Sequence, residues 1–349
     1  MLAAAACALL SGCYLMQAAT GQYRVLHARV PIDRLIAAPG TEPQLRARLT
    51  EVLAAREFAS RELGLPDNQS YRSYADIHRE FVVWNVVAAP EFSLQPQRWC
   101  FPIAGCVAYR GYFHERQARA LALTLEARGF DVVVEGVPAY STLGKFADPV
   151  LSSMLRYDDE DLAATIFHEL AHQLLYVPND SAFNEAFAVT VEEEGLTRWL
   201  EHQGAAARLA RWRTEQQHET ALLALLLPAR ARLAALYASA APEAQMRAGK
   251  RRIFAELAGD IRALERREGT RYGVYDEWMA RGLNNAQLAS IATYYACVPG
   301  FKRLLAAQQG DLPRFYAAVR TLARESREQR HAGLCEPASD SAGAAAQAF

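Results

Sequence analysis

Residues 165–195 read TIFHELAHQLLYVPNDSAFNEAFAVTVEEEG, in which a short polar break separates two apolar segments with helical periodicity. The first segment contains an H-E-x-x-H motif made by His168, Glu169 and His172. Side chains four residues apart lie on the same face of a helix, so both histidines can reach one ion. Glu169 projects beside that face, where it can take a proton from a bound water molecule. The spacing therefore predicts a metal site rather than a helix with two incidental histidines.

The break between the segments, VPNDS at 177–181, predicts a turn followed by a second helix with Ser181 as its N-cap. A connection this short joins two helices into an antiparallel hairpin. The hairpin sets Glu185 level with His172, where a further ligand is needed. Two histidines and one glutamate with an open fourth position are typical of a catalytic zinc site. We therefore predict one Zn2+ ion bound by His168, His172 and Glu185.

Two more acidic residues follow on the second predicted helix. Glu192 and Glu193 lie about 10 Å beyond Glu185 along the helix axis. Glu192 is the alternative third ligand, and either residue could orient His168 or His172 by a hydrogen bond to the ring.

The N-terminal stretch MLAAAACALLSGC is apolar and ends in LSGC at 10–13, which resembles the lipobox of bacterial lipoproteins. The basic residues that usually open such a leader are missing. The resemblance implies a signal peptide at 1–12, a lipid on Cys13 and a protein anchored in the cell envelope, facing the periplasm. An ordinary cleaved signal and a short buried helix are the alternatives. No later stretch is expected to span a membrane.

Composition excludes one class of partner and accounts for the cysteines. The 349 residues carry a net charge of -1 without a basic block, so nucleic acid is not expected as a partner. Beyond the leader lie Cys100, Cys106, Cys297 and Cys335. In an exported protein these suggest two disulfides, a local Cys100–Cys106 bond and, by default, a Cys297–Cys335 bond. A metal site at the cysteines is disfavoured because no C-x-x-C pair is present.

The pattern along the chain predicts an α+β, mostly helical fold with a small N-terminal α/β part and a helical C-terminal part. An amphipathic helix is expected at 41–65 and a loop at 136–149, and the chain from 157 to about 327 is almost wholly helical. Runs of β-branched and aromatic residues predict strands at 81–89, 107–113 and 130–135, with a helix at 114–129.

We expect four segments along the chain. They are the signal peptide at 1–12, an N-terminal helix and sheet subdomain at 13–156, a helical catalytic subdomain with the H-E-x-x-H motif at 157–336, and a disordered tail at 337–349.

The chain resembles a family of bacterial zinc aminopeptidases, many of them predicted lipoproteins. The likeness covers nearly the whole mature chain and is carried by LGLPDNQSYRSYADI, VVWNVVAAPEFSLQPQRWCFPIAGCVAYRGYF, GVPAYSTLGKFADPVLSSML, IFHELAHQLLYV, FNEAFAVTVEEEG and NNAQLASIATYY. More distantly, N-E-A-F-A at 184–188 is similar to the N-E-G-F-A motif of the gluzincins, whose glutamate is a zinc ligand and maps onto Glu185. Twelve residues separate His172 from Glu185 here, fewer than is usual in that group. The resemblance implies a zincin-like metallopeptidase fold and a peptide substrate.

The predicted reaction is hydrolysis of a peptide bond by a zinc-activated water, with Glu169 as the general base. The family implies an aminopeptidase. A zinc endopeptidase of the cell envelope and a non-catalytic lipoprotein that binds zinc or peptide are the alternatives.

Further residues are expected around the reacting bond. A tyrosine hydroxyl is the usual second donor to the oxyanion in resembling enzymes, and the candidates are Tyr294, taken as the prediction, Tyr272, Tyr275 and Tyr295. Residues 140–142 are predicted to pair with the substrate backbone, with an ordinary turn as the alternative. The carboxylates that could bind the free amine of an aminopeptidase substrate are Glu91, Asp148, Glu192 and Glu193.

Overall fold

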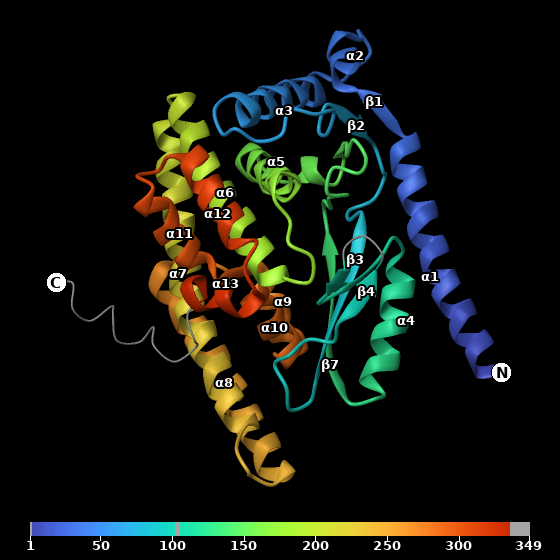
Figure 1. Cartoon of the computed structure of the whole chain (residues 1–349), viewed down its shortest axis with the longest axis vertical. Coiled ribbons are helices and arrows are strands. Elements are labelled where there is room, and N and C mark those ends of the chain that lie inside the picture. The colour runs from blue at the N-terminus through green and yellow to red at the C-terminus, as the bar shows by residue number, and fades with distance from the viewer. Residues whose placement is uncertain (1, 102–104, 336–349) are drawn as a thin grey trace.

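The computed structural model describes residues 2–101 and 105–335. The chain is 62% helical, and the described part contains three small sheets that helices surround (Figure 1). This confirms the predicted α+β, mostly helical class.

The first part of the chain combines helices with short strands. Its central sheet has the order β6-β3-β7 and is antiparallel, with Val83 paired to Val137. A second sheet has the order β1-β2-β8, and β4 pairs with β5 in a hairpin. The elements are α1 (Leu2–His27), β1 (Arg29–Pro31), α2 (Ile32–Ala37), α3 (Pro43–Arg61), β2 (Ser73–Ala75), β3 (Val83–Pro90), β4 (Trp99–Phe101), β5 (Gly105–Val107), β6 (Arg110–Tyr112), α4 (Glu115–Glu126), β7 (Phe130–Val137) and β8 (Val150–Leu151).

The central sheet is covered on both faces. Val86 packs in one cluster with Ala118 of α4, whereas its neighbour Val87 packs with Ala286 of α10. Consecutive residues of a strand point to opposite faces, so α4 and α10 lie on the two sides of the sheet. The sheet is therefore continuous with the helical part of the chain rather than a separate body.

The second part of the chain is helical. Its first long helix, α5, begins at Asp159 because the side chain of Asp158 accepts the N–H of Asp161 at 2.8 Å, and acidic residues favour a helix N-terminus. The elements are η1 (Met154–Arg156), α5 (Asp159–Leu174), α6 (Ser181–His202), α7 (Ala206–Tyr237), α8 (Glu243–Glu268), α9 (Gly273–Arg281), α10 (Asn285–Tyr295), α11 (Val298–Ala307), α12 (Leu312–Leu322) and α13 (Arg327–Leu334).

The largest apolar core draws on both parts of the chain. It includes Phe58 of α3, Phe167 of α5, Phe187 of α6 and Phe315 of α12, all of which are buried. A second core cluster lies between α7, α8, α9 and α10. The α5–α6 hairpin contributes many side chains to the first core, so its two helices are packed on several sides.

Helix α7 differs from one expectation. By length and composition it is the one helix, within residues 2–101 and 105–335, that could cross a membrane, whereas no such segment was predicted after the leader. Its residues Leu222, Leu226 and Leu233 are buried in the second core, where α7 packs along α8 (Figure 1). That packing accounts for part of its apolar composition.

The N-terminal helix α1 crosses the predicted end of the signal peptide without a break. The ring of Tyr14 lies 5.4 Å from that of Phe101, and Gln17 accepts the N–H of Phe113 at 3.1 Å. The residues just after Cys13 thus belong to the folded protein. The signal peptide and the lipid remain predictions, and the predicted tail at 337–349 lies outside the described residues.

Candidate metal centre and active site

Helices α5 and α6 pack together and bring three of the predicted site residues to one point. The Nε2 atoms of His168 and His172 are 3.1 Å apart. Oε2 of Glu185 lies 3.4 Å from Nε2 of His168 and 3.5 Å from Nε2 of His172. The three side chains are largely buried. Helical periodicity puts the two histidines on one face, and the short connection turns Glu185 towards them.

The spacing of these three atoms fits a zinc ion. Ligand atoms bound about 2.1 Å from a tetrahedral zinc lie about 3.4 Å from one another. The observed separations of 3.1, 3.4 and 3.5 Å are close to that value. The residue types also fit, because imidazole nitrogen and carboxylate oxygen are ordinary zinc ligands.

Glu192 supports this arrangement from behind the ring of His168. Its Oε2 lies 2.8 Å from Nδ1 of His168, so in the neutral ring this bond places the proton on Nδ1 and leaves a lone pair on Nε2. Glu192 therefore lies on the side of the ring away from the point where the three atoms meet. Its position corresponds to the orienting role rather than to the alternative role of third ligand.

Burial and charge set the ionisation of the site. Burial alone would raise the pKa of Glu185, but His172 and the hydrogen bonds from both histidines lower it to about 2. Burial also lowers the pKa of His168, yet Glu185 and Glu192 together raise it well above its usual value. Burial raises the pKa of Glu169, against the opposite effect of the two histidines. A raised pKa moves a carboxylate towards the basicity that a general base needs near neutral pH.

The connection between the two helices is held by Asn184, whose importance the sequence did not indicate. Asn184 Oδ1 accepts the N–H of Val177 at 2.7 Å, and its Nδ2 donates to the carbonyl of Val177 at 2.8 Å. The residue is 1% exposed and directly precedes Glu185. Asn184 thus ties the turn to the helix that carries the third ligand candidate.

The four tyrosines that were candidates for the oxyanion donor do not lie together. The side chain of Tyr294 lies outside the described residues. Tyr295 donates to Glu219 at 2.6 Å. Tyr272 donates to Glu268 at 2.6 Å, and Tyr275 packs against Trp278 in the second core. These contacts of Tyr272 and Tyr275 are with residues other than the two histidines and Glu185.

Two tyrosines that the sequence did not single out interact with residues of the cluster. Burial, and after it the charge of Glu185, raises the pKa of Tyr109, with smaller effects from Tyr176 and Glu169. The ring of Tyr176 lies edge-on to that of His172, with 6.4 Å between the ring centroids. Tyr109 follows β5, far from the H-E-x-x-H motif in sequence, and nothing in the pattern distinguishes it among 15 tyrosines.

The predicted amine-binding carboxylates separate into two groups. Glu91 is paired with Arg247 at 2.7 Å, and Asp148 accepts the N–H of Thr142 at 2.9 Å and its hydroxyl at 2.8 Å. Burial raises the pKa of Asp148 to about 6. Because Asp148 accepts the N–H of Thr142, that N–H is already bonded within the chain, and pairing of residues 140–142 with a substrate stays a prediction.

Glu192 and Glu193 line a cavity of about 330 Å³. Burial raises the pKa of Glu193 to about 7, although Lys302 lies 2.5 Å from it. The cavity lies between α5, α6, α7 and α10 and is bordered by Asp161, Val189, Glu192, Glu193, Trp212, Glu215, Gln216, Glu219 and Tyr295. Since Glu192 also bonds His168, this acidic cavity adjoins the histidine and glutamate cluster.

The described residues contain one more group of potential metal ligands, Cys297, His331 and Cys335. Its two cysteines form a disulfide, as do Cys100 and Cys106, so both predicted pairings are confirmed. Oxidised sulfurs are not thiolate ligands, which leaves the cluster at His168 as the candidate centre.

The α5–α6 hairpin thus holds His168 and His172, with Glu169 between them in sequence and Glu185 beside them in space. These residues define an H-E-x-x-H protein with a buried polar centre. The chain belongs to the family described as "Putative aminopeptidase", whose model matches residues 13–334. Membership places the chain among the peptidases. No curated protein and no solved structure matches it.

Proposed function

We propose that this protein is a zinc-dependent aminopeptidase whose metal is held by His168, His172 and Glu185. The observation that carries the proposal is the set of three donor atoms 3.1 to 3.5 Å apart, with Glu169 next to them in sequence. The family supplies the substrate class, since a peptidase acts on peptides.

Each residue of the centre has a separate task in peptide hydrolysis. A bound zinc ion would polarise the scissile carbonyl and acidify the attacking water. Glu169 takes the proton of that water and delivers it to the leaving amine, and its raised pKa suits both transfers. Glu192 holds the ring of His168 in the tautomer that presents Nε2 to the metal.

We take Tyr109 as the candidate donor to the oxyanion. Burial and, after it, the negative charge of Glu185 raise the pKa of its hydroxyl, so the hydroxyl stays protonated and able to donate. A preorganised donor of this kind contributes about 3 kcal/mol to the transition state in other hydrolases. Tyr294 stays a prediction for the same role.

The acidic cavity favours an exopeptidase over an endopeptidase. A free N-terminal ammonium is attracted by carboxylates, whereas an internal peptide group carries no such charge. Glu193, Glu219 and Glu192 provide that negative potential in the cavity behind the ring of His168, and Trp212 offers an aromatic wall.

We also propose that the protein lies in the bacterial cell envelope, anchored through a lipid on Cys13 and facing the periplasm. Two disulfides agree with an oxidising compartment. A Cys13→Ser form should leave the membrane fraction, whereas a wild-type protein that is already soluble would remove the anchor from the proposal.

Two forms of one peptide, with a free and with an acetylated N-terminus, test the reaction. Wild-type protein loaded with zinc is incubated with one peptide in free and N-acetylated forms, and products are followed by mass spectrometry. Stepwise removal of N-terminal residues from the free peptide alone is expected. Internal cuts in both forms would favour the endopeptidase, and stoichiometric zinc without cleavage would favour a binding lipoprotein.

A further inference from the structure

The connection at 175–180 joins α5 to α6. Because the two histidines are on α5 and Glu185 is on α6, a shift of this connection would change the distances between all three side chains. Asn184 of α6 is hydrogen-bonded to the connection at Val177. Two other segments, distant in sequence, also contact the connection.

The first of these segments is the hairpin of β4 and β5. Asn179 has a φ of 68°, and its Oδ1 accepts the N–H of Cys106 at 2.9 Å. Arg98 donates to the carbonyl of Asn179 at 3.3 Å and to that of Cys106 at 3.1 Å. A Cβ at Gly105 would lie 2.9 Å from Oδ1 of Asn179. Arg98, Gly105 and Cys106 therefore contact the connection directly at Asn179.

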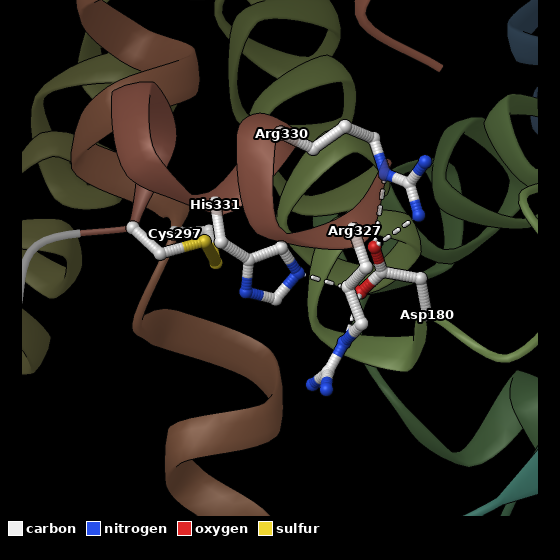
Figure 2. Close-up of a disulfide and its surroundings, with 6 residues drawn as sticks. Asp180, Cys297, Arg327, Arg330 and His331 are labelled. Atoms are coloured by element: carbon white, nitrogen blue, oxygen red, sulfur yellow. Dashed lines mark hydrogen bonds and ion pairs between the residues drawn. A yellow bond between two sulfur atoms is a disulfide. The ribbon is translucent and has the colours of Figure 1, made fainter. Parts of the chain in front are cut away.

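The second segment is α13, which meets the connection at Asp180 (Figure 2). Asp180 is only 1% exposed. Arg330 donates to its Oδ2 from Nε at 3.0 Å and from Nη2 at 2.8 Å, and Nε2 of His331 lies 2.8 Å from its Oδ1. Arg330 is itself buried and lies over the ring of Phe183 at 5.4 Å. Leaving such a buried charge without its partner is strongly unfavourable.

The position of α13 is set by a disulfide and a close helix contact. Cys335 at its end is bonded to Cys297, the residue before α11 (Figure 2). A Cβ at Gly300 of α11 would lie 2.1 Å from the carbonyl oxygen of Leu334, so only glycine permits this approach. Helix α11 packs in turn on α6. The disulfide thus fixes Arg330 and His331 where Asp180 needs them.

We propose that Asp180 is a positioning residue for the metal centre, and that the Cys297–Cys335 disulfide holds its partners Arg330 and His331 in place. The inference rests on the proposed function, because it concerns the ligand set of that centre. Asp180 touches none of the ligands. Its carbonyl accepts the N–H of Asn184 at 3.1 Å, so the residue that Arg330 and His331 hold is the one at which α6 begins, five residues before Glu185.

Two variants and a matched control separate positioning from general stability. Asp180→Asn removes the charge, and the double variant Cys297→Ala/Cys335→Ala removes the disulfide. The disulfide is removed by substitution with alanine and not by chemical reduction. Reduction would leave two free thiols beside His331, and these three side chains could bind a metal ion themselves. The control is Glu160→Gln on α5, a buried glutamate that pairs with two arginines at 2.8 and 2.5 Å and lies away from the connection.

The metal-free proteins are titrated with Co2+ in competition with a chelator, and the visible absorption band reports the coordination geometry. Far-UV circular dichroism reports the fold. Both variants should bind Co2+ about 10-fold more weakly, with a changed band, whereas Glu160→Gln should match the wild type. If Asp180→Asn does not fold, His331→Ala, which keeps the bonds of Arg330, should show the same change to a smaller extent.

The outcomes are distinct. Tight wild-type binding together with unchanged affinity and band in the variants would overturn this inference alone. An equal loss in Glu160→Gln would overturn it as well, since the effect would then be general. A wild type that binds no Co2+ would overturn the proposed function and this inference with it.

Discussion

Replacing Glu192 with glutamine tests whether its bond to His168 orients a metal ligand. The carboxylate bonds Nδ1 of His168 at 2.8 Å and is 25% exposed, so this bond is charge-assisted and only partly screened. Such bonds contribute about 1.5–3 kcal/mol, and glutamine retains a neutral acceptor of similar shape. Loss of a partner that orients a ligand weakens metal binding about 10-fold to 100-fold. Because the glutamine still offers an amide oxygen to His168, we expect zinc affinity to fall by about 10-fold. That factor corresponds to about 1.4 kcal/mol.

The assay is competition for Zn2+ between the protein and a chromophoric chelator at neutral pH. The matched control is Glu194→Gln, the same substitution two residues along α6. Glu194 pairs with Arg198 at 2.7 Å in an i,i+4 ion pair that contributes little to the site. Glu194→Gln should therefore keep wild-type affinity. Equal zinc affinity in Glu192→Gln and wild type would refute the reasoning that this bond orients a ligand.

Three further predictions concern catalysis, pH and packing. Tyr109→Phe should lower kcat about 100-fold while zinc content stays unchanged, measured by peptide turnover and metal analysis; wild-type turnover would exclude it as the oxyanion donor. Because the raised pKa of Glu193 lies at about 7, this carboxyl is neutral below and charged above that pH. KM for a peptide with a free amine should thus fall as pH rises through 7, and Glu193→Gln should abolish this dependence. Gly300→Ala should destabilise the protein by about 1–3 kcal/mol in thermal unfolding, since the added methyl meets the backbone of Leu334, whereas Gly259→Ala in open space on α8 should not.

Local patterns predicted the elements and the juxtaposition at the site. β-Branched runs predicted the strands that the structure has as β3 and β7, and helical periodicity with a short break predicted the α5–α6 hairpin. The proximity of His168, His172 and Glu185 follows from that hairpin, because the hairpin and the proximity of these side chains both depend on contacts close in sequence. Metal binding by these residues remains a prediction.

Contacts between distant parts of the chain could not be predicted in this way. Ser181 has the residue type of an N-cap, but the N-cap position is taken by Asp180, whose carboxylate makes no capping bond and instead pairs with Arg330, 150 residues away. Tyr109 packs against Val87, Val133 and Ala286, and the negative charge of Glu185, 76 residues further along the chain, helps to raise its pKa. A sequence pattern records the period of an element and its caps, and it holds no information on which remote side chain reaches them.

The most direct test of the account compares wild type with Glu169→Gln in metal content and peptide digestion. Both proteins are loaded with zinc, dialysed, analysed for metal and incubated with a mixture of peptides. We expect about one zinc per chain in both proteins, N-terminal trimming by wild type and none by the variant. Trimming at the wild-type rate by Glu169→Gln would contradict the proposed role of this glutamate, and absence of zinc from the wild type would contradict the metal centre itself.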